Sequence, residues 1–453
     1  MSFFLSLASS PSPSIVVTVI AVVIVATTSV EAVDPEPFVL PSAPLLDPSP
    51  GRSWFRNNSN GERGILVAAG NASTGRPLYY LRLLNDTAPL SAVRVSVDLA
   101  TIYTDSNVSV MDRNYDSNGE PSSYAAFRRT YANATRAGFL LRLVTATGGS
   151  TEYMIPGSVN LTEGPFLKIA GLTVVWFAFV ASDGSLRTAT MGDKGASLLP
   201  PGYFQVTPNG LTGVYDLSMG PGDSLLMFTF KATNVTTLAT SLYYMGWDHA
   251  TRTIAVPPTI IGDFSLFPGP TATQGMGSGY VSAFYSGTCD QWTQLLAMCF
   301  SAAGVPLGPA IVLANNTHVG AGRPFVAPHI DFGTLADGWV VSFPMMLPNG
   351  TVHYYLSHTG ANCVQSTGPG MAKINTAANT HHGAVSSEGS ARLVLYQTNE
   401  VGDVGGPMIL AFIRLTISQS NNWVFARGGT TAPVFSSSLL SPAATSAPCT
   451  PPT

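Results

Sequence analysis

A repeated pair of apolar segments is the feature that most restricts the fold of this chain. Seven times, a short apolar run is followed by a second run that starts 13 to 17 residues later, with turn residues between the two. The first runs are spaced 49 to 59 residues apart, about 54 on average, which is the period of a repeat architecture. They begin at residues 65, 124, 173, 225, 280, 339 and 391.

The residues within and between these runs favour strands. No sustained helical stripe occurs outside the N-terminal segment, while glycine (44) and proline (34) are frequent. The runs at 173–180 and 225–230 are apolar without alternation, which is typical of strands buried on both faces. Further runs at 252–256 and 310–314 follow two of the pairs. Four strands in each unit is the content of a propeller blade.

The sequence therefore predicts an all-β fold, a β-propeller of seven four-stranded blades over residues 61–435. Six or eight blades, β-sandwiches and a β-helix are the alternatives. The predicted organisation around this domain is a signal peptide at 1–32, a Pro-rich linker at 33–60, and a Ser/Pro/Thr-rich tail at 436–453.

The N-terminal segment is typical of a secretion signal. The apolar run Ser14–Ala26 is shorter than the ~20 residues that span a bilayer. Val30 and Ala32 occupy the small-residue positions of a cleavage site, although no Lys or Arg precedes Arg52. We expect a chain that is secreted or displayed at the cell surface. The alternative is an uncleaved anchor, the one case in which the protein would contact a membrane.

The charge of the chain excludes one class of partner and raises a question about solubility. Charged residues make up 10% of the chain, against about 25% in an average soluble domain, and the net charge is −4. No basic patch is present, so nucleic acid is excluded as a partner. Low charge beside 45% hydrophobic residues lowers solubility unless something else covers the surface.

N-linked glycans are the predicted cover. Nine N-x-S/T motifs occur, at Asn57, Asn71, Asn85, Asn107, Asn133, Asn160, Asn234, Asn315 and Asn349. On a propeller most of them fall in turns at one end of the blades. The opposite end then stays bare, and we expect a partner to dock there; longer loops at the glycosylated end are the competing explanation.

The four cysteines suit an oxidising compartment. They are Cys289, Cys299, Cys363 and Cys449, with no spacing typical of a metal site. Three pairings are open. The short loop between Cys289 and Cys299 makes that pair the predicted disulfide, and a buried free thiol is the alternative.

Three acidic residues are candidates for binding at the bare end. Asp223, Asp337 and Glu388 each lie just ahead of the first strand of a predicted pair. Oxygen donors from converging loops suit Ca²⁺. No single loop carries a calcium motif, however, so no cofactor is assigned. Ordinary turn chemistry is the competing explanation.

A second set of candidates lies on the predicted innermost strands, which line the central channel of a propeller. His329, His381 and His382 are candidate binding residues, although adjacent histidines on a strand point to opposite faces. Asp216 and Asp331 are candidate catalytic carboxylates, because glycoside hydrolysis needs two such groups. No metal site is assigned.

No motif in the chain specifies a reaction: the nucleophile elbow, the zinc-protease helix motif and the phosphate loop are all absent from the sequence. We therefore expect a secreted or cell-surface glycoprotein that uses a propeller as a platform for binding or adhesion, with an extracellular protein or glycan as its ligand. The alternatives are a secreted carbohydrate-active hydrolase with its site in the central channel, and a structural coat glycoprotein.

Overall fold

The computed structural model describes segments between Leu45 and Phe435. Every regular element in them is a β-strand, and none is a helix long and apolar enough to cross a membrane. The described residues are 45–46, 54–56, 62–70, 75, 77–84, 89–95, 102–113, 122–144, 149–170, 174–192, 203–261, 271–276, 279–288, 291–319, 329–333, 338–346, 352–360, 363, 371–373, 382–388, 391–399, 408–417, 423–425 and 434–435.

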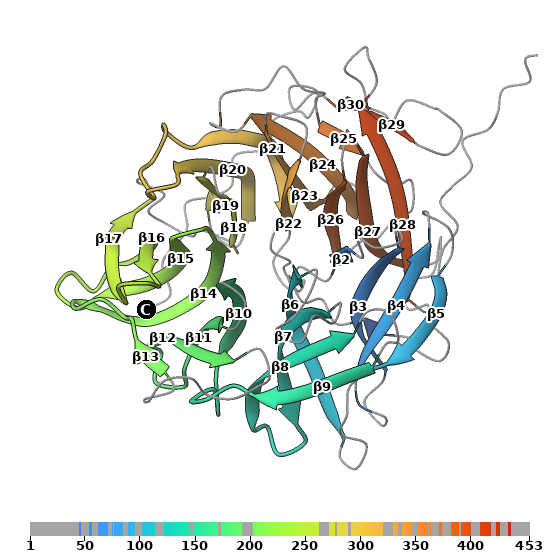
Figure 1. Cartoon of the computed structure of the whole chain (residues 1–453). Coiled ribbons are helices and arrows are strands. Elements are labelled where there is room, and N and C mark those ends of the chain that lie inside the picture. The colour runs from blue at the N-terminus through green and yellow to red at the C-terminus, as the bar shows by residue number, and fades with distance from the viewer. Residues whose placement is uncertain are drawn as a thin grey trace, which may run out of the picture.

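The strands form antiparallel sheets arranged around a common centre, so the fold is a β-propeller (Figure 1). Each blade is named here after its innermost strand. The first sheet contains β1 (Leu45–Leu46), β2 (Trp54–Arg56), β3 (Glu62–Gly70), β4 (Leu78–Leu84) and β5 (Pro89–Arg94). The β6 blade contains β6 (Tyr103–Arg113), β7 (Ser122–Tyr131), β8 (Arg136–Val144) and β9 (Gly149–Met154). The β10 blade contains β10 (Glu163–Ala170), β11 (Val174–Val180), β12 (Leu186–Gly192) and β13 (Tyr203–Gln205).

The later blades repeat this order. The β14 blade contains β14 (Leu211–Pro221), β15 (Leu225–Asn234), β16 (Thr240–Asp248) and β17 (Thr253–Ile260). The β18 blade contains β18 (Thr271–Met276), β19 (Gly279–Thr288), β20 (Gln291–Ser301) and β21 (Ile311–Val319). The β22 blade contains β22 (His329–Gly333), β23 (Gly338–Met346), β24 (Val352–Gly360), β25 (Met371–Lys373) and, from the end of the described chain, β30 (Val434–Phe435). The β26 blade contains β26 (His382–Glu388), β27 (Ala391–Asn399), β28 (Met408–Ile417) and β29 (Trp423–Phe425).

The predicted all-β propeller is confirmed, and each predicted pair of apolar runs forms an antiparallel hairpin in the middle of a sheet. Within the described strands, the β18 and β22 blades are joined into one larger sheet through the pair His318–Met346. The number of blades stays a prediction.

The repeat period reappears in the hydrogen bonds between blades. Thr229 of β15 bonds to Ser282 of β19, 53 residues later, and the N–H of Thr273 donates to Ser218 Oγ, 55 residues earlier. Equivalent positions of successive blades therefore touch. Around them, the central strands are buried on both faces, as Leu225–Ala232 of β15 illustrates, because each sheet packs against a neighbour on either side.

The first sheet begins earlier than the sequence predicts. Two short strands, β1 and β2, lie inside the segment 33–60 that was expected to be a linker, and both pair with β3. Trp54 and Phe55 pair with Ile65 and Gly64 of β3. This part of the segment is therefore built into the propeller.

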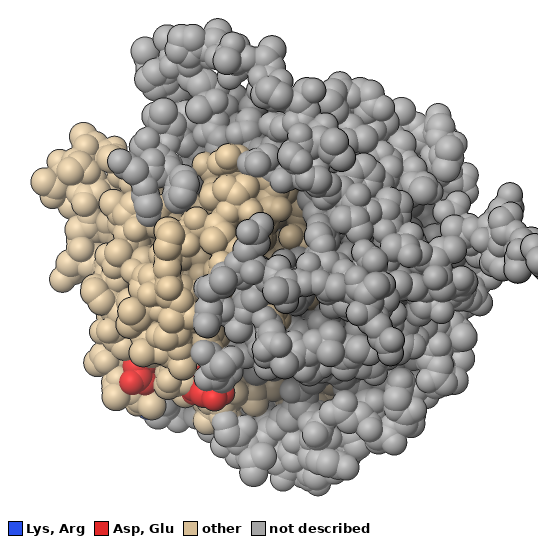
Figure 2. Space-filling model, turned by 90° about the horizontal axis from the view of Figure 1, so that it is seen from above, with Lys and Arg blue, Asp and Glu red and all other residues tan. Residues whose placement is uncertain are grey.

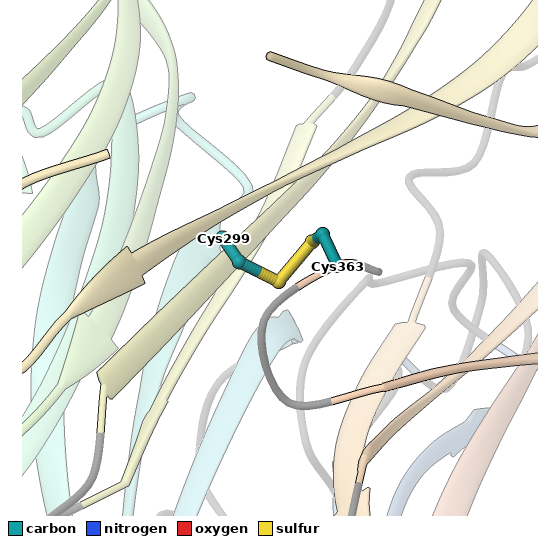
Figure 3. The surroundings of a disulfide bond; sticks show 2 residues. All are labelled: Cys299 and Cys363. Carbon is teal, nitrogen blue, oxygen red and sulfur yellow. A yellow bond between two sulfur atoms is a disulfide. The ribbon is translucent and has the colours of Figure 1, made fainter. Parts of the chain in front are cut away.

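The predicted disulfide is wrong: Cys299 is bonded to Cys363, with 5.5 Å between their Cα atoms (Figure 3). Gln291 begins β20, and Cys299 lies about 26 Å further along it at about 3.3 Å per residue. A partner just before Gln291 would have to span most of that distance, whereas a disulfide joins Cα atoms about 6 Å apart. The observed bond instead ties the β18 blade to the segment after β24. Cys289 and Cys449 lie outside the described residues.

Figure 2 shows one side of the molecule, on which the described surface is mostly uncharged, with acidic side chains in small spots near its lower edge. Within the described residues, large apolar side chains are also exposed, among them Leu238, Val305 and Met154. The low charge of the sequence thus corresponds to a surface with few charged groups in this view.

Candidate functional site

A carboxyl group lies between the innermost strands of two neighbouring blades. Glu163 is the first residue of β10, and its side chain reaches β14 of the next blade. Its Oε1 accepts a hydrogen bond from the N–H of Asp216 at 2.6 Å, and its Oε2 accepts one from the N–H of Leu217 at 2.5 Å. Glu163 therefore holds the backbone of β14 with both of its oxygens.

The backbone of β14 is irregular at this point. Its pairing with β15 shifts register on both sides of Tyr215, and Asp216 has a φ of 50°. This left-handed conformation is uncommon for residues other than glycine, and such irregularities re-aim side chains near functional sites. The side chain of Tyr215 turns outward and is 42% exposed, while Val214 and Leu217 stay buried.

Cationic side chains flank the two carboxyl groups. Lys231 of β15 forms an ion pair with Asp216, and its side chain is only 9% exposed against 32% for Asp216. From the β6 blade, Arg128 donates to the carbonyl oxygen of Thr162 at 2.7 Å and to Ser106 Oγ at 3.2 Å. Three successive blades thus contribute charged groups to one location.

The protonation of Glu163 is shifted by this environment. Burial raises the pKa of Glu163 to about 7, and the negative charge of Asp216 acts in the same direction. The two backbone N–H bonds and Arg128 oppose this rise without cancelling it. Glu163 is therefore a carboxylic acid that still holds its proton over much of the range below neutral pH, beside an Asp216 that is paired with a lysine.

At the opposite end of the same blades lies Asp223, which follows β14 as the sequence predicts and is exposed. Its carbonyl oxygen accepts from Lys168 Nζ at 2.9 Å and lies 2.9 Å from His249 Nε2. Burial lowers the pKa of Lys168 to about 8, against the charge of Asp223. No group of three or more metal-binding side chains is found among the described residues, and Ca²⁺ binding stays a prediction.

The remaining candidates are placed only in part. His329 and Asp331 lie on β22, and His382 and Glu388 begin and end β26, so these four are on innermost strands, but their side chains are outside the description. His381 and Asp337 lie outside the described residues.

The structure therefore joins Asp216 to a residue that the sequence analysis missed, Glu163. One signal was available: Glu163 precedes Asp216 by 53 residues, close to one repeat, so the two occupy corresponding positions in neighbouring blades.

Comparison with known proteins gives distant structural likenesses. No family model and no curated protein sequence matches the chain. A Dyadobacter fermentans protein of unknown function is similar over 81% of this chain and 94% of its own, at 12% identity and a TM-score of 0.45. An α-L-arabinanase from Penicillium chrysogenum, solved with arabinobiose, is similar over 83% of this chain and 98% of its own, at 10% identity and a TM-score of 0.42. A Trypanosoma rangeli sialidase is similar over 80% of this chain and 54% of its own, at 11% identity and a TM-score of 0.42. At such low identities and scores, the function of this chain has to be sought in its own residues.

Proposed function

We propose that this chain is an exported glycoside hydrolase whose reaction centre is formed by Glu163 and Asp216. The observation that supports this most directly is the contact between Glu163 and the backbone of Asp216, which brings two carboxyl-bearing residues together on the innermost strands of adjacent blades. Partial burial raises the pKa of Glu163 to about 7. Glycoside hydrolysis uses such a pair, with the two groups kept in different protonation states by their surroundings.

The roles follow from the two environments. Glu163 donates its proton to the glycosidic oxygen as the bond to the anomeric carbon breaks. Asp216, held by Lys231, acts on the anomeric carbon directly or through a water molecule. Tyr215 lies next to Asp216 with its ring partly exposed, which suits contact with a sugar ring.

The test is hydrolysis of nitrophenyl glycosides and natural oligosaccharides by the exported protein and its variants. Glu163→Gln should lower kcat by about a hundred- to ten-thousand-fold. The loss should be smaller for dinitrophenyl glycosides, whose leaving group needs no proton. Asp183→Asn is the matched control, because Asp183 is an exposed carboxylate paired with Arg187 in the same blade as Glu163, and its activity should be unchanged.

Asp216→Asn should also abolish turnover, but it leaves the buried Lys231 without its partner. The double variant Asp216→Asn with Lys231→Met restores the charge balance and should recover stability without activity. If the wild-type protein hydrolyses no glycoside in the panel yet binds glycans or cells, the proposal fails and the binding platform expected from the sequence takes its place.

A further inference from the structure

The structure describes the side chains of three asparagines in glycosylation motifs, and these three lie at the same end of the blades. Of two further motif residues, Asn107 in β6 and Asn315 in β21, only the backbone is described. Asn133 is in the turn between β7 and β8, Asn234 closes β15 before β16, and Asn160 lies between β9 and β10. In an antiparallel blade, the turn after the second strand and the connection that leads into the next blade emerge at the same end. This is also the end at which β10 begins with Glu163.

In two of these asparagines the side-chain oxygen is hydrogen-bonded within the turn. Asn133 Oδ1 accepts from the N–H of Thr135 at 3.0 Å, and Asn234 Oδ1 accepts from the N–H of Thr236 at 2.8 Å. In each case the oxygen of the planar amide faces the turn, so the nitrogen lies on the other side, directed away from it. Asn160 is exposed, with a φ of 59° in the left-handed region that asparagine tolerates.

Apolar side chains stand exposed beside two of these asparagines. Val159 precedes Asn160 and is 51% exposed, while Val235 and Leu238, in the turn after Asn234, are 50% and 78% exposed. Leu238 has a φ of 56°, a backbone conformation that favours glycine or asparagine over leucine. Packing against the protein does not explain these side chains.

We propose that Asn133, Asn160 and Asn234 carry N-linked glycans, and that the sugars on Asn160 and Asn234 cover Val159 and the Val235–Leu238 turn. Covalent sugars would keep this end of an otherwise weakly charged protein in solution. This inference needs passage through the secretory pathway, which the N-terminal segment predicts, but it does not depend on any hydrolase activity.

Site occupancy is the first part of the test. The chain is expressed in a secretory host that adds N-glycans, and the glycans are released enzymatically in ¹⁸O water so that mass spectrometry marks each occupied asparagine. We expect all three positions to be labelled. A chain that is not exported, or is exported with these positions unmodified, overturns the proposal.

A pair of matched variants tests the cover. Thr236→Ala destroys the motif at Asn234 but keeps the backbone N–H that bonds to Asn234 Oδ1, whereas Thr236→Ser keeps both. Thr236→Ala should bind a hydrophobic fluorescent dye several-fold more strongly than Thr236→Ser and aggregate at lower concentration. Adding Leu238→Ser to Thr236→Ala should reverse most of that change. Equal dye binding by Thr236→Ala and Thr236→Ser would contradict the covering role.

Discussion

Glu163 accepts a hydrogen bond from the backbone N–H of Asp216 at 2.6 Å, so one carboxyl group fastens the innermost strands of two blades together. The same contact sits beside the ion pair between Asp216 and Lys231. The protonation of Glu163 is thereby linked to the stability of the fold as well as to the proposed chemistry.

The first prediction concerns stability against pH. The pKa of Glu163 rises from 4.5 to about 7 on folding, so between these values the unfolded chain has lost its proton while the folded chain keeps it. The contribution of this group to stability therefore falls as pH rises through that window, by an amount on the order of 3 kcal/mol. Glu163→Gln should remove this fall, as measured by urea denaturation at a series of pH values.

The control for that experiment is Asp183→Asn. Hydrogen bonds from Ser185 lower the pKa of Asp183, with Arg187 contributing, so the stability that Asp183 contributes is lost only as the pH falls into the acid range. This substitution therefore changes the pH dependence of stability only in acid. It should therefore retain the loss of stability between pH 4.5 and about 7 that Glu163 causes. Denaturation curves in which wild type and Glu163→Gln change in parallel across this window would contradict the assignment.

A second prediction concerns Arg129, which is buried in the β6 blade. It bonds to Asp105 at 2.7 Å and to Glu152 at 2.8 Å, with Tyr103 beneath the guanidinium. Burial alone would lower the pKa of Arg129, but its bonds to the two carboxylates outweigh burial and raise it. Arg129→Met removes the cation that both carboxylates share and should lower the free energy of unfolding by about 3–5 kcal/mol.

The comparison for Arg129 is Arg187→Met, which breaks the exposed pair with Asp183. That change should cost less than about 1 kcal/mol in the same denaturation assay. If the two substitutions lower the free energy of unfolding equally, burial does not make the ion pairs of Arg129 more stabilising than an exposed pair.

A third prediction concerns three buried hydroxyl groups between the β14 and β18 blades. Thr273 Oγ1 donates to Thr229 Oγ1 at 2.7 Å, and Ser282 Oγ lies 2.7 Å from Thr229 Oγ1 and 3.0 Å from Thr273 Oγ1. Thr229→Val removes one member and should lower stability by about 1–2 kcal/mol, whereas Thr229→Ser keeps the hydroxyl and this ring of bonds. If valine is tolerated as well as serine in thermal denaturation, the ring does not stabilise this interface.

The fourth prediction is the connectivity of the cysteines. Peptide mapping without reduction should recover Cys299 linked to Cys363, and replacing both by alanine should lower stability by about 2–4 kcal/mol. If the mapping instead recovers a peptide in which Cys289 is linked to Cys299, the pairing predicted from the sequence is correct.

The central strands of the blades could be predicted from the sequence because a strand that is buried on both faces is an uninterrupted apolar run. Val174–Val180 of β11 is apolar throughout, and every predicted hairpin is present. The innermost strands were harder to find. The strand β18, Thr271–Met276, is short, and its two threonine side chains bond to a neighbouring blade, so it lacks the apolar run of a central strand.

The candidate site could be predicted only by half. Asp216 was found because it lies on an apolar strand near the expected channel, but Glu163 was not. What joins them is the irregular backbone around Asp216, whose N–H groups meet a side chain from the previous blade. Periodicity shows which positions repeat, and it does not show where a strand departs from regular pairing.

The most direct test of the central claim is the pH dependence of kcat/KM for glycoside hydrolysis. Glu163 must be protonated to act as the acid, so the rate should fall as pH rises through about 7, and this limb should be absent in the residual activity of Glu163→Gln. A wild-type rate that stays level through neutral pH, or a limb that persists in Glu163→Gln, would contradict the role assigned to Glu163.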